Sequence, residues 1–148
     1  ITLSFVWILF IALFGLRLGT VGMFPNIIPM TITLSLLPLT NTPFDFATVL
    51  ISSVTLGLCV DDTIHWLHYF RLSKENGDQD PSIQTSQMMF KPLLLTSIIL
   101  GIGFGVLGIA DLVILKKFGI FTTLAIGLAW VADIIALPAI IRTFKLNK

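Results

Sequence analysis

Long stretches without a charged side chain are the feature that most constrains what this chain can fold into. Residues 1–16 carry no Asp, Glu, Lys or Arg, and neither do residues 18–44, 47–60, 92–110 and 118–132. A helix needs about 20 residues to cross the hydrocarbon core of a bilayer. The alternating pattern of membrane β-strands, in segments of about ten residues, is not found in these continuous apolar runs. The sequence therefore predicts membrane-spanning helices.

The composition excludes several functional classes. Of the 148 residues, 55% are hydrophobic and only 11% are charged, whereas about 25% are charged in an ordinary soluble domain. The net charge of +1 leaves no basic excess for binding nucleic-acid phosphates. Cys59 is the only cysteine, so a disulfide framework or a cysteine-rich zinc site is excluded. We expect an integral membrane protein of the all-α class, with no metal, no cofactor and no enzymatic activity.

The charged residues divide the chain into five expected helices within one transmembrane domain, residues 1–148. The first is short for a span, and we interpret it as a truncated helix that begins outside this sequence. The polar segment 71–90 is expected to form a loop. Within it, Asp80-Pro81 is typical of a helix N-cap followed by its first residue, and predicts a short surface helix up to a fourth span near Pro92. The expected helices cover approximately residues 1–16, 20–39, 44–70, 91–111 and 118–141.

The distribution of Lys and Arg predicts the orientation of these helices. With five spans, seven of the nine basic residues fall on one side and only Lys116 and Lys117 on the other. Loops rich in Lys and Arg face the cytoplasm. We therefore expect the 71–90 loop and the C-terminus to be cytoplasmic, in a multi-pass protein of the plasma or bacterial inner membrane.

The third expected helix carries ionisable residues that are costly inside a bilayer. Ser53, Gly57, Asp61 and His65 recur every four positions and so form one stripe. Asp62 lies three residues before His65, within reach of its imidazole. An ionised side chain at the centre of a lipid-facing helix costs about 2.5–3.5 kcal/mol on insertion scales. We therefore expect the stripe to face another helix or water.

Two adjacent carboxyl groups cannot both ionise at low cost in an apolar environment. At least one is expected to retain a proton near neutral pH, which suits Asp61, Asp62 and His65 to a proton relay. A solvated helix end is the alternative, but residues 46–60 span about 22 Å at 1.5 Å per residue. That is less than the ~30 Å hydrocarbon thickness, so the acids should lie within the membrane. A metal site is disfavoured because all four candidate ligands lie on one helix.

Other polar and small residues within the spans predict helix contacts. Asp133, in the fifth helix, is either a second member of the relay or a polar packing contact. Gly101 and Gly105 form a GxxxG motif, which allows close approach of a neighbouring helix, and Gly57 gives the stripe of the third helix a similar small position. In the second helix, Asn26 lies between two prolines, where we expect a kink or local unwinding.

The segment Gly57–His65 (GLCVDDTIH) resembles the GxxVDDTIH segment of the resistance–nodulation–division (RND) exporters. The nearest branch is the MMPL-type, or hydrophobe/amphiphile efflux, group, which is related to sterol-sensing-domain proteins. Other features agree in order along nearly the whole chain. They are Pro25-Asn26 with Pro29, Lys91-Pro92 with Thr96-Ser97 and the following glycines, and Asp133 with Leu137-Pro138-Ala139.

This resemblance implies the last five of the six helices in one half of a proton-driven exporter of lipids, drugs or other amphiphiles. It implies proton coupling by Asp61 and Asp62, and less directly by His65. The implied partners are the bilayer, the substrate, the porter domain and other half of the same transporter, and in some cases further copies of it. The alternative is a sterol-sensing-like module that binds lipid and regulates without transport.

The orientation can be tested with reporter fusions. A reporter inserted at residue 78 and another after Lys148 should both be cytoplasmic, because their flanks hold most of the Lys and Arg. A reporter at residues 113–115 should lie outside. Accessibility to a membrane-impermeant label measures this. Positions 78 and 148 on opposite sides would contradict the five-span arrangement.

Overall fold

The computed structural model describes residues 2–39, 46–144 and 146, and within these residues the chain is helical with no strand. This confirms the all-α prediction. The helix α4 passes through one turn of π-helix, η1, directly into α5. The elements are α1 (Thr2–Leu39), α2 (Phe46–Glu75), α3 (Pro81–Leu107), α4 (Val113–Val131), η1 (Ala132–Ala136) and α5 (Leu137–Thr143).

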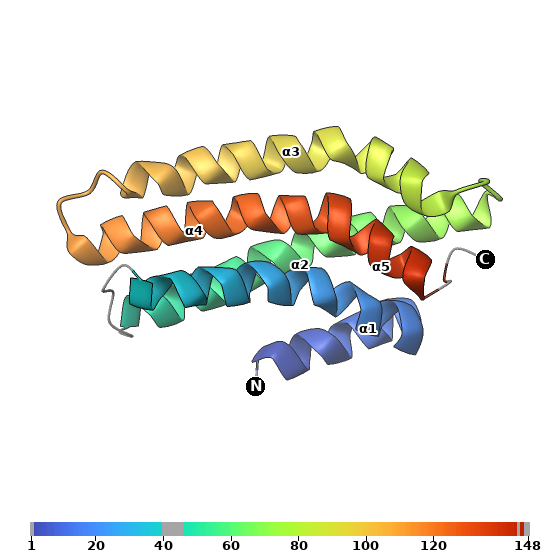
Figure 1. Ribbon diagram of the computed structural model, residues 1–148, viewed down its shortest axis with the longest axis horizontal. Helices are drawn as coiled ribbons and strands as arrows, with labels where there is room; N and C mark the ends of the chain where they lie inside the picture. Colours follow the sequence, from blue (N-terminus) through green and yellow to red (C-terminus); the bar gives the residue numbers. More distant parts are fainter. Residues whose placement is uncertain (1, 40–45, 145, 147–148) are drawn as a thin grey trace.

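The helices lie side by side along the long axis of the molecule, and the N-terminal arm of α1 folds back beside the rest of that helix (Figure 1). The helical units are α1, α2, α3 and the continuous rod α4–η1–α5. The helix α2 contacts α1, α3 and α4, while α3 packs mainly along α4. Five separate helices were predicted, whereas the described residues form four continuous helical units, and the difference lies in α1, which is bent at Gly15.

Residues 2–39 form two helical arms that meet in a sharp turn at Gly15. This agrees with the predicted helices over 1–16 and 20–39, although the turn was expected at residues 17–19. Gly15 has φ 83° and ψ 168°, a conformation that glycine adopts without a steric penalty. The two arms lie against each other (Figure 1), and a Cβ built on Gly19 would be 2.6 Å from the Phe10 carbonyl oxygen. The turn is therefore at Gly15, whereas the prediction of unwinding near Asn26 was wrong, because the backbone there remains helical.

The connector between α2 and α3 is much shorter than the predicted 71–90 loop. The pair Arg71 Nε to Glu75 Oε1, at 3.1 Å, spans the last turn of α2. The helix then ends in a Schellman motif, in which Asp78 N–H donates to the Ser73 carbonyl and Gly77 takes a left-handed φ of 77°. Only residues 76–80 are non-helical. The predicted start at Pro81 is correct, but α3 runs unbroken through Pro92 instead of forming two helices.

Among the residues that the structure describes, three helical stretches are long and apolar enough to cross a membrane: Thr2–Pro38, Pro81–Leu107 and Val113–Thr143. The outer face of α3 carries Leu95, Ile98, Ile102 and Val106, all exposed. A soluble monomer rarely exposes such a continuous apolar surface, and lipid is its natural neighbour. The helix α2 is not among these three stretches of the described residues, and its centre carries Asp61, Asp62, His65 and His68.

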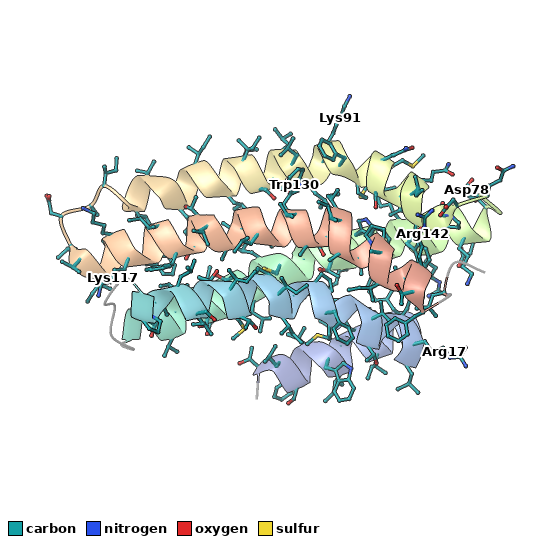
Figure 2. All side chains as sticks on the ribbon, viewed as in Figure 1. Arg17, Asp78, Lys91, Lys117, Trp130 and Arg142 are labelled. Atoms are coloured by element: carbon teal, nitrogen blue, oxygen red, sulfur yellow. The ribbon has the colours of Figure 1, made fainter. Side chains whose placement is uncertain are left out.

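The basic residues separate to opposite ends of the bundle. Figure 2 shows Lys117 at the end where α3 and α4 join, with Arg17 and Arg142 at the far end. Arg17 and Arg142, which were counted on one side of the membrane from the sequence, thus lie at the end opposite Lys117, while Lys91 lies between the two ends. This arrangement accords with helices aligned along the membrane normal.

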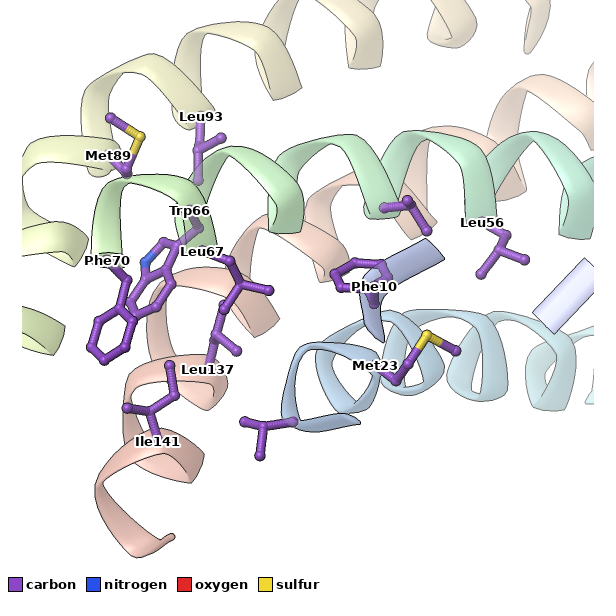
Figure 3. Close-up of a cluster of buried hydrophobic side chains, with 12 residues drawn as sticks. Phe10, Met23, Leu56, Trp66, Leu67, Phe70, Met89, Leu93, Leu137 and Ile141 are labelled. Carbon is purple, nitrogen blue, oxygen red and sulfur yellow. The ribbon is translucent and has the colours of Figure 1, made fainter. Parts of the chain in front are cut away.

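The larger hydrophobic cluster joins α1, α2, α3 and α5 (Figure 3), and a smaller one, of Leu37, Ile51 and Phe121, joins α1, α2 and α4. Trp66 and Phe70 of α2 stack with ring centroids 5.5 Å apart. Leu137 and Ile141 of α5 are fully buried in the larger cluster. That cluster therefore fixes α5 against α2, close to Asp133.

The tightest helix contact joins α3 and α4 at the end of the bundle near Lys117. A Cβ built on Gly119 would lie 2.5 Å from the Phe104 carbonyl oxygen and 2.6 Å from the Gly108 nitrogen. Both atoms belong to backbone, which cannot move aside without shifting a helix. Gly101 and Gly105 also face α4, at 3.8 and 3.6 Å from atoms of Thr123.

We predict that Gly119→Ala destabilises the protein by about 1–3 kcal/mol, because it forces α3 and α4 apart. Gly127→Ala is the matched control, since Gly127 is in the same helix with open space around it. That change should be neutral or slightly stabilising through helix propensity. Thermal unfolding in detergent measures both, and equal midpoints for the two variants would show that the α3–α4 contact is not tight.

Candidate functional site

The most deeply buried ionisable side chain is Asp133, which is 1% exposed, among the residues that the structure describes. It lies in the π-helical turn η1, where the Leu137 N–H donates to the Ala132 carbonyl, five residues back. Pro138 follows directly and has no N–H to donate, which favours such a widening of the helix. From this turn the Asp133 carboxyl group reaches α2.

Thr63 of α2 is the hydrogen-bond partner of this carboxyl group. Its hydroxyl donates to Asp133 Oδ1 at 2.8 Å, and the Thr63 side chain is completely buried. Asn26 of α1, also buried, donates from Nδ2 to Thr63 Oγ1 at 3.2 Å and to the Gly22 carbonyl at 2.8 Å. A chain of hydrogen bonds thus runs from α1 through α2 to η1.

The Thr63 hydroxyl has a single proton and more than one acceptor. Asp133 Oδ1 is the nearest, the Cys59 carbonyl in its own helix is 3.0 Å away, and Asn26 Oδ1 is 3.4 Å away. If the Asp133 carboxyl group gains a proton it becomes a donor, and Thr63 can then turn its own proton to Cys59. The network can therefore accommodate both protonation states of Asp133.

The predicted relay residues of α2 divide between two faces. Asp61 and His65 point outward, with side chains 73% and 61% exposed, and His65 Nε2 lies 3.8 Å from Asp61 Oδ1. Asp62 is half-buried and interacts electrostatically with Asp61, His65 and Asp133. Asp62 is therefore intermediate in burial between the exposed Asp61–His65 pair and the buried Asp133 carboxyl group.

The outward stripe of α2 is not covered by any helix in the described part of the chain. Ser53, Gly57, Asp61 and His65 are all exposed, and nothing lies within 4 Å of a Cβ built on Gly57. The expectation that Gly57 packs against a neighbouring helix therefore finds no partner within these residues. The acids also lie near the middle of α2, about 22 Å from either end, and not at a helix end.

Two members of the network, Thr63 and Asn26, were not identified as site residues from the sequence. Asn26 is an uncharged polar residue in an apolar run. Because it lies between two prolines, we expected a backbone kink there and no specific role for its side chain. Thr63 directly follows the two acids and therefore points about 100° away from Asp62 around the helix. The burial of both residues depends on which faces of three helices meet, and that is a tertiary property.

No family model, curated protein or solved structure matches this chain. No three His, Cys, Asp or Glu side chains come together as metal ligands in the described ranges. The functional argument therefore depends on the residues themselves. An acid with a hydroxyl partner and no cation partner among the described residues can take up and release a proton.

We predict that Thr63→Val destabilises the protein by about 1–3 kcal/mol, because it leaves the buried Asp133 and Asn26 groups without their partner. Thr55→Val is the matched control, since Thr55 is also buried in α2 but its hydroxyl has no hydrogen-bond partner. Unfolding midpoints in detergent distinguish them. A Thr55→Val variant as unstable as Thr63→Val would mean that packing, and not the hydrogen bonds, accounts for the loss.

Proposed function

We propose that this chain is the transmembrane part of a proton-driven exporter of hydrophobic or amphiphilic molecules, of the RND/MMPL type. The observation that carries the proposal is the buried Asp133 carboxyl group, bonded to Thr63, which directly follows Asp62 in the neighbouring helix. A buried acid without a compensating cation is costly to keep charged. Such groups mark proton pathways in membrane proteins.

The proton pathway in this proposal begins at the exposed pair and ends at the buried acid. Asp61 and His65 exchange protons with water at the outer face of α2. Asp62, half-buried on the same helix, passes the proton inward. Asp133 receives it, and the Thr63 hydroxyl reorients toward the Cys59 carbonyl. Loss of charge at Asp133 weakens the interaction between η1 and α2 and allows the two to shift.

The uncovered stripe of α2 favours a second transmembrane half as the partner. An ionisable stripe facing lipid would be costly, and the described chain does not cover it. The other half of the same transporter would place water or polar side chains against Asp61 and His65. In this proposal the five passes predicted from the sequence include both arms of α1, with the C-terminus in the cytoplasm.

The DDTIH motif and its neighbours are the support for the RND/MMPL class, and with it for amphiphilic substrates such as lipids or drugs. A sterol-sensing-like module is the second candidate. It would share the helices but would not need to titrate an acid. Dependence on a proton gradient separates the two functions.

We predict that Asp62→Asn or Asp133→Asn in the full-length protein reduces export to the level seen when a protonophore is present. Asparagine keeps the shape and hydrogen bonds of aspartate but cannot titrate, so insertion and folding should stay near normal. The measurement is gradient-driven efflux of a fluorescent amphiphile from vesicles.

Asp111→Asn is the control for this experiment, since Asp111 is exposed in the turn between α3 and α4. It should leave efflux unchanged. Wild-type efflux in the Asp62→Asn, Asp133→Asn double variant would overturn the proton relay. If the wild type and all variants are folded but none shows gradient-dependent efflux, the result would favour the sterol-sensing-like module.

A further inference from the structure

A groove of about 570 Å³ separates the first half of α3 from the rod formed by η1 and α5. One wall carries Ile83 and Phe90 of α3, and the other carries Ile135 and Ala139. Ile83, Phe90 and Ile135 are exposed large hydrophobic residues, 40%, 40% and 65% respectively. The walls are therefore apolar surfaces that the described chain leaves uncovered.

The same groove is lined by two cations and two uncharged polar side chains. Lys91 has no ion pair among the described residues, whereas Arg142 pairs with Asp80. The Ser86 hydroxyl is buried and has no hydrogen-bond partner, and Gln87 lies one turn before Lys91. Figure 2 shows Lys91 extending outward from α3, on the half of the bundle that holds Arg142. The groove thus joins apolar walls to one unpaired positive charge.

The length of α3 places this groove at the boundary of the bilayer. Its 27 residues extend about 40 Å at 1.5 Å per residue, some 10 Å more than the hydrocarbon core of about 30 Å. If Leu107 lies at one boundary, the other falls about 20 residues earlier, near Met88. Ser86, Gln87 and Lys91 lie within one turn of that position. They are at the depth of lipid headgroups.

We propose that the groove between α3 and α5 is a binding site for an anionic phospholipid. One acyl chain lies along the apolar walls, and the phosphate lies within reach of Lys91, Arg142 and the Ser86 hydroxyl. A lipid fits better than a soluble anion, because the walls continue into the lipid-facing side of α3 at Leu95 and Ile98. Basic pockets between membrane helices are suited to anionic headgroups.

This inference is independent of proton transport and requires only that the helices cross a membrane. A single unpaired cation matches the one negative charge of a phosphodiester headgroup. Binding would bridge α3 and α5, which the Asp80–Arg142 pair already joins at the end of the groove. The bound lipid would therefore fill the part of the interface between α3 and α5 that protein side chains leave open.

The test is native mass spectrometry of the purified full-length protein in neutral detergent. The probe is an equimolar mixture of phosphatidylglycerol and phosphatidylcholine with identical acyl chains. Wild-type protein should retain phosphatidylglycerol preferentially. Lys91→Gln should reduce that preference about fivefold, as expected for the ~1 kcal/mol contributed by one basic residue. Lys91→Arg should restore it.

A second variant tests the groove by shape and leaves its charge unchanged. Ala139→Trp fills the apolar wall at an exposed position, and should reduce the retention of both lipids without unfolding the protein. Lys116→Gln is the control, because Lys116 is an exposed cation at the opposite end of the bundle. It should behave as the wild type. Unchanged preference in both Lys91→Gln and Ala139→Trp, or an equal loss in Lys116→Gln, would overturn the proposed site.

Discussion

The hydrogen bond between Thr63 and Asp133 is the interaction on which the arrangement of the bundle depends. Burying a carboxyl group among apolar helices without a partner costs several kcal/mol. The Thr63 hydroxyl, held in turn by Asn26, compensates for that cost only when α1, α2 and η1 meet at one point. Apolar packing in a membrane tolerates sliding and rotation of helices, because lipid is as apolar as the helix surface. A polar contact with fixed geometry restricts both.

The π-turn and the hydrophobic core support the same geometry from two sides. Pro138 favours the widened turn from which the Asp133 carboxyl group reaches α2. Just beyond it, Leu137 and Ile141 anchor α5 on Trp66 and Phe70. The carboxyl group therefore lies at a backbone irregularity, and the packing that follows prevents the irregularity from relaxing to a regular helix. Removing either feature would alter the position of the other.

Some properties of this fold were predictable from the sequence and others were not. Uncharged runs were sufficient to predict an all-helical protein, and Asp80-Pro81 correctly marked the start of α3. The polar residues 71–75 were read as a loop, but an Arg71–Glu75 pair and a glycine cap extend α2 through them. A turn between the first two expected helices was predicted after residue 16, and the structure places it at Gly15. The close approach of the two arms, between Gly19 and the Phe10 backbone, is a tertiary contact that the sequence does not indicate.

The candidate site was predicted only in part, for a reason that its residues make clear. Asp61, Asp62 and His65 were conspicuous because charge in an apolar run is rare. Thr63 and Asn26 were not, because hydroxyl and amide groups are common in membrane helices, where they bond to their own backbone. Which acid is buried depended on the faces that α1 and η1 present to α2. Asp133, left open as relay or packing residue, makes the packing contact, and its role in a relay remains a proposal.

The close contact at Gly119 holds one end of the continuous rod α4–η1–α5 against α3. Backbone meets backbone at that end, whereas at the other end α3 and α5 meet through side chains, in the hydrophobic core and in the Asp80–Arg142 pair, with the groove beside them. Arg142 is about 35 Å from Gly119 along the rod at 1.5 Å per residue. A rotation of about 5° around the glycine contact would therefore move the tip of α5 by roughly 3 Å. A small change in the angle between α3 and α4 at Gly119 would therefore change the width of the groove between α3 and α5 by about the size of a methyl group.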